Sequence, residues 1–331
     1  MSQSLTTVPK VQPTGQRPAG RNWAKAVVFG DRPYMLYLAF AVLLVSFSAA
    51  SPVFLSVDNF MNIGRQTALV SIIAVGMTFV IVCGQIDLSV GSTLALSGMV
   101  AALVMQDVSN NWIVGALAGI CTGALVGWIN GVLTARLLIP SFLVTLGMLG
   151  MARGVSLVLT NTKPVLITNP EYYAIFGEGA IAGIPVPIVW TILAFLVGGL
   201  VLHGTTYGRR VYATGGNATA ARYSGINTKR TTTTAFVITG ALTGLAALVL
   251  TARSHAARPD FAGGLELDVI AAVILGGSSL FGGRGLILGT LLGSLIIGTL
   301  NNGLVLLGVS SALQLVIKGA IIIAAVAFTR K

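Results

Sequence analysis

The feature that most constrains this chain is a series of apolar stretches that recurs along almost its whole length. An α-helix needs about 20 largely apolar residues to cross the hydrocarbon core of a bilayer. Of the 331 residues, 55% are hydrophobic and 9% are charged, which is typical of a chain that lies mostly in lipid. We expect an all-α polytopic membrane protein with about ten transmembrane helices, at residues 34–50, 66–84, 88–105, 112–135, 140–160, 184–204, 231–252, 267–282, 285–307 and 311–329.

The charged residues predict how these spans are oriented, because Lys and Arg near span ends stay in the cytoplasm. With the N-terminus inside, fourteen of the twenty basic residues fall at cytoplasmic ends: Lys10, Arg17, Arg21, Lys25, Arg32, Arg136, Arg209, Arg210, Arg222, Lys229, Arg230, Arg284, Arg330 and Lys331. The acidic residues gather at the opposite ends: Asp58, Asp107, Glu171, Glu178, Asp260, Glu266 and Asp268. Both patterns predict cytoplasmic termini. The net charge of +11 then reflects topology and attraction to anionic lipids, and we expect no nucleic-acid binding.

The first 33 residues differ from the rest of the chain. They are polar and basic, contain four prolines, and lack the apolar core and small-residue cleavage site of a signal peptide. We therefore expect a disordered basic cytoplasmic arm over residues 1–33, followed by a transmembrane domain over residues 34–329.

The chain shows no motif for ATP hydrolysis, covalent catalysis or metal binding. The glycine-rich stretch from Gly276 to Gly289 lacks the Gly-Lys-Ser/Thr of a phosphate-binding loop, and a tight cytoplasmic hairpin between two spans is the better interpretation. Ion-coupled carriers usually keep ionisable relay groups inside the membrane. Here the clear ionisable residues within spans are two cations, Arg153 and Lys318. Any energy for transport is therefore expected from another subunit.

A long polar and basic loop, residues 205–230, lies between two spans on the predicted cytoplasmic side. Asn217 is a suitable N-cap for a short helix over Ala218–Ser224. Gly225 suits the position after a helix, and the residue that follows it can contact Ala221 as in a Schellman cap. The sequence therefore predicts a short, capped and largely exposed helix.

The surface of this helix suggests either of two roles. Its alanines leave a low surface from which Arg222 projects, and Arg209, Arg210, Lys229 and Arg230 frame it with positive charge. Such a surface fits insertion into a cleft on a partner. An amphipathic interfacial helix in an ordinary cytoplasmic loop has a similar pattern.

Four stretches, in this order along the chain, resemble a known family. They are VGMTFVIVCGQIDLSVGSTLALSG at 75–98, GGNATAARYSGIN at 215–227, ELDVIAAVILGGSSLFGGRG at 266–285 and NNGLVLLGVSS at 301–311. Together they resemble the membrane permease subunits of ribose-type sugar ABC importers, and the resemblance spans nearly the whole chain after residue 33. The sequence departs from the family pattern at one position. The family motif reads Gly-Ile-Asp-Leu-Ser, whereas here Gln85 stands in the glycine-side position, and this difference affects the turn expected at Gly84.

The resemblance implies a type II importer-like bundle of about ten helices that works as a homodimer in the bacterial cytoplasmic membrane. It implies ABC ATPase subunits on the cytoplasmic side, which hold ATP and Mg, and a sugar-binding protein on the other side. The permease domain would cover 34–329, with a cytoplasmic coupling loop at 205–230 in which 215–227 receives the ATPase. The chain itself would carry no cofactor and catalyse no covalent reaction.

Several polar residues within or beside spans are candidates for transport roles. Asp87 is well placed to cap a helix that begins at Leu88, and a direct role in translocation is the alternative. Neutral amides suit a sugar path, although each also suits a helix-to-helix hydrogen bond. They are Gln66, Asn130, Asn301, Asn302 and Gln314. Glu266 and Asp268, at the predicted outer mouth, either pair with a docking binding protein or sit in solvent.

Two other functions remain open from the sequence. A self-sufficient secondary sugar carrier or facilitator needs no ATPase, and a membrane scaffold needs no substrate. Neither accounts for the capped cytoplasmic helix. The sugar itself stays open between ribose, another pentose, a hexose and a polyol.

Overall fold

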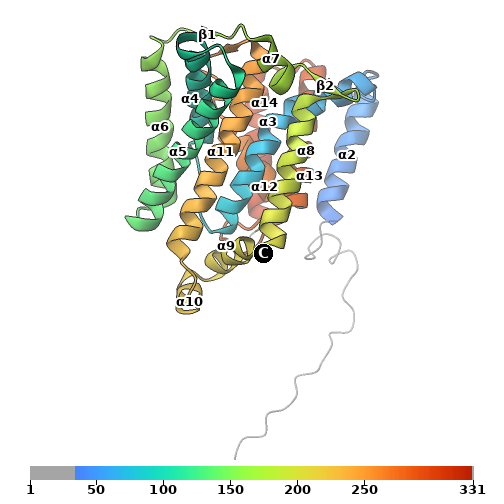
Figure 1. Cartoon of the computed structure of the whole chain (residues 1–331). Coiled ribbons are helices and arrows are strands. Elements are labelled where there is room, and N and C mark those ends of the chain that lie inside the picture. Colours follow the sequence, from blue (N-terminus) through green and yellow to red (C-terminus); the bar gives the residue numbers. More distant parts are fainter. Residues whose placement is uncertain (1–33, 330–331) are drawn as a thin grey trace, which may run out of the picture.

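The computed structural model describes residues 34–329, so the predicted arm over 1–33 and the last two residues lie outside the described part. The chain is a helical bundle with two tiny two-stranded sheets at one end (Figure 1). In order, the elements are α2 (Tyr34–Ala50), α3 (Val57–Val82), α4 (Val90–Leu103), the π-helical turn η1 (Val104–Val108), α5 (Trp112–Arg136), α6 (Ser141–Leu159), β1 (Val165–Leu166), α7 (Pro170–Tyr172), η2 (Tyr173–Gly177), β2 (Ala180–Ile181), β3 (Ile184–Pro185), α8 (Val186–Gly199), η3 (Leu200–Gly204), α9 (Thr206–Gly216), α10 (Ala218–Tyr223), α11 (Thr228–Ser254), β4 (Ala256–Ala257), α12 (Leu265–Leu275), α13 (Ile287–Leu306) and α14 (Ser311–Thr329).

Each of the ten predicted spans has a helix in the structure. Seven helical segments of the described chain are long and apolar enough to cross a membrane: Val57–Val82, Val90–Val108, Trp112–Arg136, Ser141–Leu159, Val186–Gly204, Thr228–Ser254 and Ile287–Leu306. The helices α2 and α14 complete the ends of the bundle. The prediction of a crossing helix over 267–282 is wrong, because α12 has only 11 residues and ends at Leu275.

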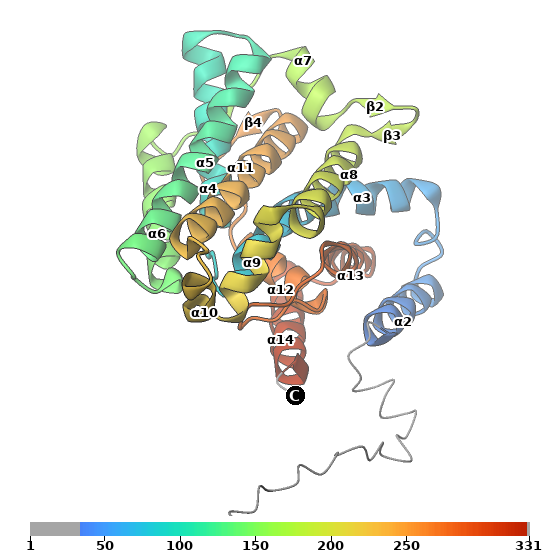
Figure 2. The ribbon, with the colours of Figure 1, turned by 60° about the horizontal axis from the view of Figure 1, so that its bottom comes forward.

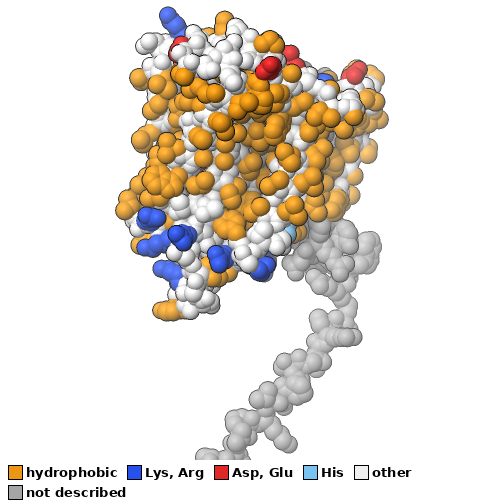
Figure 3. All heavy atoms as spheres, in the orientation of Figure 1, with side chains coloured by type: hydrophobic (Ala, Val, Ile, Leu, Met, Phe, Trp, Pro, Cys, Tyr) orange, Lys and Arg blue, Asp and Glu red, His pale blue; other side chains and the backbone are white. Residues whose placement is uncertain are grey.

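The two ends of the bundle differ in charge. Figure 3 shows a broad apolar band with Lys and Arg side chains below it, around α9 and α10, and acidic side chains near the opposite end. We call the first end the basic face; its exposed Lys and Arg residues include Arg136, Arg209, Arg210, Arg222, Lys229 and Arg230. The second end, which carries β1 and β4, is the opposite face (Figure 1). The apolar band matches a segment that lies in lipid.

Glycines bring α5 and α11 into backbone contact. A face of small residues on α5 packs directly on α11, where a Cβ on Gly123 would overlap the carbonyl of Gly240 and one on Gly127 would overlap that of Phe236. Because hydrocarbon gives helices little hydrophobic reason to associate, close packing of small residues supplies much of the attraction. These contacts bring the backbones of α5 and α11 together along several turns.

Polar side chains join α3 to α13 along their length. The pairs are Asn59–Asn302, Ser71–Ser294 and Thr78–Thr290, with bonds of 2.8–3.1 Å. Buried hydroxyl and amide groups need such partners because an unpaired polar group in a dry interior is costly. The ladder fixes α13 against α3, whose C-terminal half is buried in the main core.

The chain between α11 and α12 folds back into the bundle. β4 pairs with β1 on the opposite face, with Ala257 beside Val165. After β4 the loop runs from the opposite face toward the middle of the bundle, where Arg153 of α6 donates hydrogen bonds to the carbonyls of Pro259 and Phe261. Arg153 lies six residues before the end of α6, which is about 9 Å along the helix axis from that end. Irregular backbone at this depth is tolerated where protein surrounds it, so α12 starts inside the bundle and is short.

A pair of glycine substitutions tests the packing of α5 on α11. Gly123→Val should lower stability by about 1–3 kcal/mol or more, because the new side chain overlaps the α11 backbone. Thermal unfolding in detergent measures the loss. Gly147→Val, on the exposed side of α6 with nothing within 4 Å of the added Cβ, should leave the melting temperature close to that of the wild type. Equal effects of the two substitutions would contradict this packing.

Candidate functional site

The basic face is built on two short helices that follow the long span ending at Gly204. Thr205 caps α9, since its Oγ1 accepts a hydrogen bond of 3.2 Å from the backbone N–H of Gly208. α9 lies across the end of the bundle and α10 projects beyond it (Figures 1 and 2). The Tyr207 hydroxyl donates to the carbonyl of Thr231 at 3.2 Å, which ties α9 to the start of α11.

Both caps of α10 have the predicted geometry. Asn217 Oδ1 accepts hydrogen bonds from the backbone N–H groups of Thr219 at 3.1 Å and Ala220 at 2.9 Å. At the other end, Gly225 has a positive φ of 81°, its N–H bonds the Arg222 carbonyl, and the next N–H bonds the Ala221 carbonyl, each at 3.0 Å. These bonds are those of a Schellman motif. A helix of six residues is thus held at both ends.

One face of α10 is held and the other is free. Ala221 is buried, while Arg222 is exposed and Tyr223 is 90% exposed. The sequence interpretation named Arg222 but missed Tyr223. The signal for it was its place in the last helical turn, next to the glycine cap and away from the buried alanine. Aromatic and Arg side chains are the residues most enriched as anchors in protein interfaces.

Glycine contacts fix the base of α9–α10 to the bundle. A Cβ on Gly215 would overlap the Val82 carbonyl at the end of α3 and lie 2.7 Å from the N atom of Gly283. The Gly283 N–H donates to the same Val82 carbonyl at 2.9 Å. Three segments far apart in sequence therefore meet at one point: the end of α9, the end of α3 and the hairpin over 276–286.

Two hydrogen bonds strengthen this junction. The Tyr212 hydroxyl of α9 donates to the Gly285 carbonyl at 2.6 Å, and His203 Nε2 accepts from the Ile287 N–H at 3.3 Å. A phenol is protonated at neutral pH, and burial raises the pKa of Tyr212 further above that range. The helix α9 and the segment before it are thus hydrogen-bonded directly to the hairpin between α12 and α13.

Asp87 lies in the buried turn between α3 and α4. It does not cap a helix at Leu88, because α4 begins at Val90, and its Oδ1 instead accepts from the N–H of Ser89 at 2.8 Å and its hydroxyl at 2.7 Å. Asn130 donates to the same hydroxyl at 2.9 Å. The turn at Gly84 forms with φ +77°, so Gln85 is accommodated there. The carboxylate holds the turn and anchors it to α5.

The predicted path residues do not form one continuous line. The Asn302 amide forms two hydrogen bonds with the Asn59 amide, so its role is a contact between α13 and α3. Gln66 is exposed, and Gln314 donates to the Val309 carbonyl at 2.8 Å. Asn301 is the amide that contacts a charged group, through a long bond of 3.4 Å to Asp268.

Glu266 and Asp268 do not lie at the outer mouth, contrary to the prediction. Because α12 begins inside the bundle, Asp268 is buried and pairs with Lys318 at 2.9 Å. Glu266 Oε2 lies 2.5 Å from where a Cβ on Gly91 would stand, at the start of α4. The carboxylates face other helices of this chain, and a carboxylate is therefore present inside the bundle where the sequence indicated only cations.

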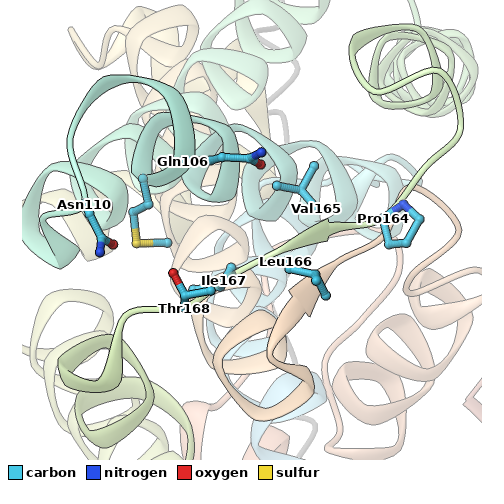
Figure 4. A pocket seen from close by; sticks show the side chains of 8 residues that line it. Gln106, Asn110, Pro164, Val165, Leu166, Ile167 and Thr168 are labelled. Carbon is cyan, nitrogen blue, oxygen red and sulfur yellow. The ribbon is translucent and has the colours of Figure 1, made fainter.

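The opposite face carries a cavity of about 460 Å³ beside β1. Figure 4 shows it between the β1 segment, with Val165, Leu166 and Ile167, and side chains from η1, including Gln106. Among the described residues, no cluster of His, Cys, Asp and Glu is suited to hold a metal ion. The surface at this end offers a concave region and neutral polar groups for contact with another molecule.

Residues 59–326 match the model of a family described as branched-chain amino acid transport system / permease component. The chain belongs to this family. As a permease component it is a multi-pass transport subunit rather than an ATPase, which confirms the class that the four motifs indicated.

Curated relatives cover most of the permease. It is 46% identical to the ribose import permease protein RbsC of Bacillus subtilis (strain 168), over 89% of this chain and 92% of that protein. It is 38% identical to the D-allose transport system permease protein AlsC of Escherichia coli (strain K12), over 92% and 93%. It is 38% identical to the L-arabinose ABC transporter permease protein AraH of Azospirillum brasilense, over 88% and 86%. No solved structure matches the chain.

Neighbouring glycines of α9 offer a matched test of the junction. Gly215→Ala should loosen α9 and α10, because its Cβ overlaps the Val82 carbonyl, whereas Gly216→Ala meets nothing within 4 Å. An overpacking cost of about 1–3 kcal/mol predicts amide hydrogen exchange across 206–223 that is faster by about tenfold. Hydrogen-exchange mass spectrometry in detergent measures it. Unchanged exchange in the Gly215 variant, or equal changes in both, would contradict the junction.

Proposed function

We propose that the permease belongs to an ATP-driven importer for a small sugar and that α10 receives the ABC ATPase on the cytoplasmic side. The observation that carries this proposal is the capped, exposed α10 on the basic face of a permease component. It is rigid, it presents Arg222 and Tyr223, and it is connected through α9 to three segments of the bundle. A force on α10 reaches the transmembrane helices without passing through a flexible linker.

The substrate class follows from the relatives. The family description mentions branched-chain amino acids, but the relatives cited above carry names for ribose, D-allose and L-arabinose permeases. We infer a monosaccharide, with D-ribose as the first probe. An extracytoplasmic sugar-binding protein would deliver it to the opposite face, and the cavity beside β1 is part of the surface available for that contact.

The assembly and location complete the proposal. The permease works as a homodimer in the bacterial cytoplasmic membrane, with ATP and Mg held by the partner ATPase. Both termini lie in the cytoplasm, because the basic face carries the exposed Arg and Lys residues around α9 and α10. Gln66, Asn130 and Gln314 remain candidates for the sugar path.

Single cysteines test the orientation. Arg210→Cys and Arg222→Cys should react with an impermeant maleimide only from the cytoplasmic side, and Lys163→Cys only from the other side. The background needs Cys83→Ala and Cys121→Ala, since Cys121 is exposed. Labelling of the Arg222 variant in intact cells would reverse the proposed topology.

Tyr223→Ala tests the docking surface without disturbing the fold, because its side chain is 90% exposed. The affinity for the ATPase should fall by about 30-fold, the effect of removing an aromatic anchor worth about 2 kcal/mol. Co-purification in mild detergent and titration with the purified ATPase measure this. Leu138→Ala, a side chain 74% exposed on the same end of the bundle, is the matched control and should bind as the wild type does.

Replacing residues 217–225 with a Gly/Ser linker should leave a folded permease that binds no ATPase and shows no ATP-driven D-ribose uptake. Undiminished uptake in this variant would overturn the proposal. If the wild type brings down no ATPase and alone carries D-ribose into vesicles, the chain is a self-sufficient carrier instead.

A further inference from the structure

A small cavity lies at the point where α12 begins inside the bundle. Its volume is about 170 Å³, and its walls come from the loop before α12, from α12 itself and from α14. Gly264 and Gly319 have no side chains and so leave room for the cavity. Leu267 and Leu315 form its apolar sides, and Asp268 and Lys318 are its charged groups. Binding sites for small molecules have this composition: mostly apolar walls with a few polar groups that fix orientation.

The cavity lies at the level of the membrane-spanning part and opens on the surface of the chain, where Leu267 and Leu315 are 51% and 63% exposed. Lys318 is seven residues after the start of α14, or about 10 Å along its axis. The loop before α12 reaches the same interior, because its Ala262 carbonyl lies 2.5 Å from where a Cβ on Gly91 would stand, at the start of α4. Two helix N-termini, those of α4 and α12, therefore meet near the cavity. Discontinuous helices of this kind often form substrate sites in transporters.

The polar groups of the cavity have unused hydrogen-bonding capacity. Asp268 Oδ2 accepts from Lys318 Nζ at 2.9 Å and from Asn301 Nδ2 at 3.4 Å. Within the described part of the chain, no donor reaches Asp268 Oδ1, and Asn301 Oδ1 is buried without a partner. The Lys318 ammonium has three N–H donors and uses one. Acceptors and donors thus stand side by side.

Stability alone gives little reason for this ion pair. The side chains of Lys318 and Asp268 are only 19% and 11% exposed. Removing two charges from water costs about as much as their attraction returns, so an apolar pair of similar volume serves a bundle equally well. Ionisable residues inside a membrane mark functional sites more often than structural ones.

We propose that this cavity is a subsite for one polyhydroxylated neutral molecule, the sugar that the permease carries; the inference rests on the proposed function. Asp268 Oδ1 accepts a hydrogen bond from one hydroxyl, and the free N–H groups of Lys318 donate to its neighbour. The ion pair leaves the site without net charge, which suits a neutral ligand. Asn301 is a positioning residue that holds the carboxylate from the side of α13. Leu267 and Leu315 contact the C–H faces of the ring.

Protection from labelling tests occupancy while the charged pair stays intact. The Leu315→Cys variant, in the C83A/C121A background, is reconstituted in vesicles and treated with a maleimide with and without saturating D-ribose. D-Ribose should slow its labelling, because the substituted side chain lines the cavity. Leu313→Cys lies on the same helix, is exposed and does not line the cavity, so its labelling should not change.

A double variant separates a binding role from a structural one. D268N/K318M removes both charges at similar volume, so the melting temperature should stay within a few degrees of the wild type. Uptake of D-ribose by the complex with its ATPase and binding protein should fall by about tenfold or more, because hydrogen bonds to charged groups are lost. Protection of the L315C variant should disappear when these substitutions are added.

The outcomes distinguish this inference from the proposed function. Protection by D-ribose needs no ATPase, so it supports the subsite even where coupled uptake fails. Wild-type uptake without protection, together with normal uptake by D268N/K318M, would overturn the subsite and leave the importer standing. Protection of both cysteine variants alike would show a change of overall conformation and also overturn it.

Discussion

The rest of the structure depends on the requirement that every backbone polar group in hydrocarbon has a partner within the protein. Long helices meet it automatically, and they make up the apolar band. Three irregular segments satisfy this requirement through hydrogen bonds to other parts of the chain. They are the 83–89 turn, the loop before α12 and the hairpin at 276–286. Val82 accepts from Gly283, and the carbonyls of Pro259 and Phe261 accept from Arg153. Each break in a helix is thus also a link between helices.

These links connect the two regions to which we assign function. Gly215 and Tyr212 tie α9, which carries α10, to the hairpin that follows α12. The other end of α12 holds Asp268, which pairs with Lys318 of α14. The 11 residues of α12 therefore run from the hairpin that contacts α9 to the charged cavity. The link between α9 and this hairpin combines the close backbone approach of Gly215 with side-chain hydrogen bonds from Tyr212 and to His203.

Local patterns predicted the helices of the bundle and the capped helix α10 well. Apolar runs found the ten helical segments, and Asn217 with Gly225 predicted the caps of α10, because capping depends on neighbours within a few residues. The error over 267–282, and with it the placing of Asp268, arose because apolarity does not distinguish a full span from a half-span that is preceded by a loop inside the bundle. The partners of Arg153 lie in the loop before α12, and the partner of Lys318 lies in α12, all far away in sequence. Single-sequence patterns hold no information on such pairs.

The central claim is that α10 is the surface through which another subunit drives the permease. A photo-reactive phenylalanine analogue introduced in place of Tyr223 tests it most directly, with the same substitution at Leu138 as the reference, in cells that express the complete importer. We expect irradiation to join the permease, from position 223, to a protein that mass spectrometry identifies as an ATP-binding subunit. Cross-links to lipid alone, or the same weak products from both positions, would contradict the account.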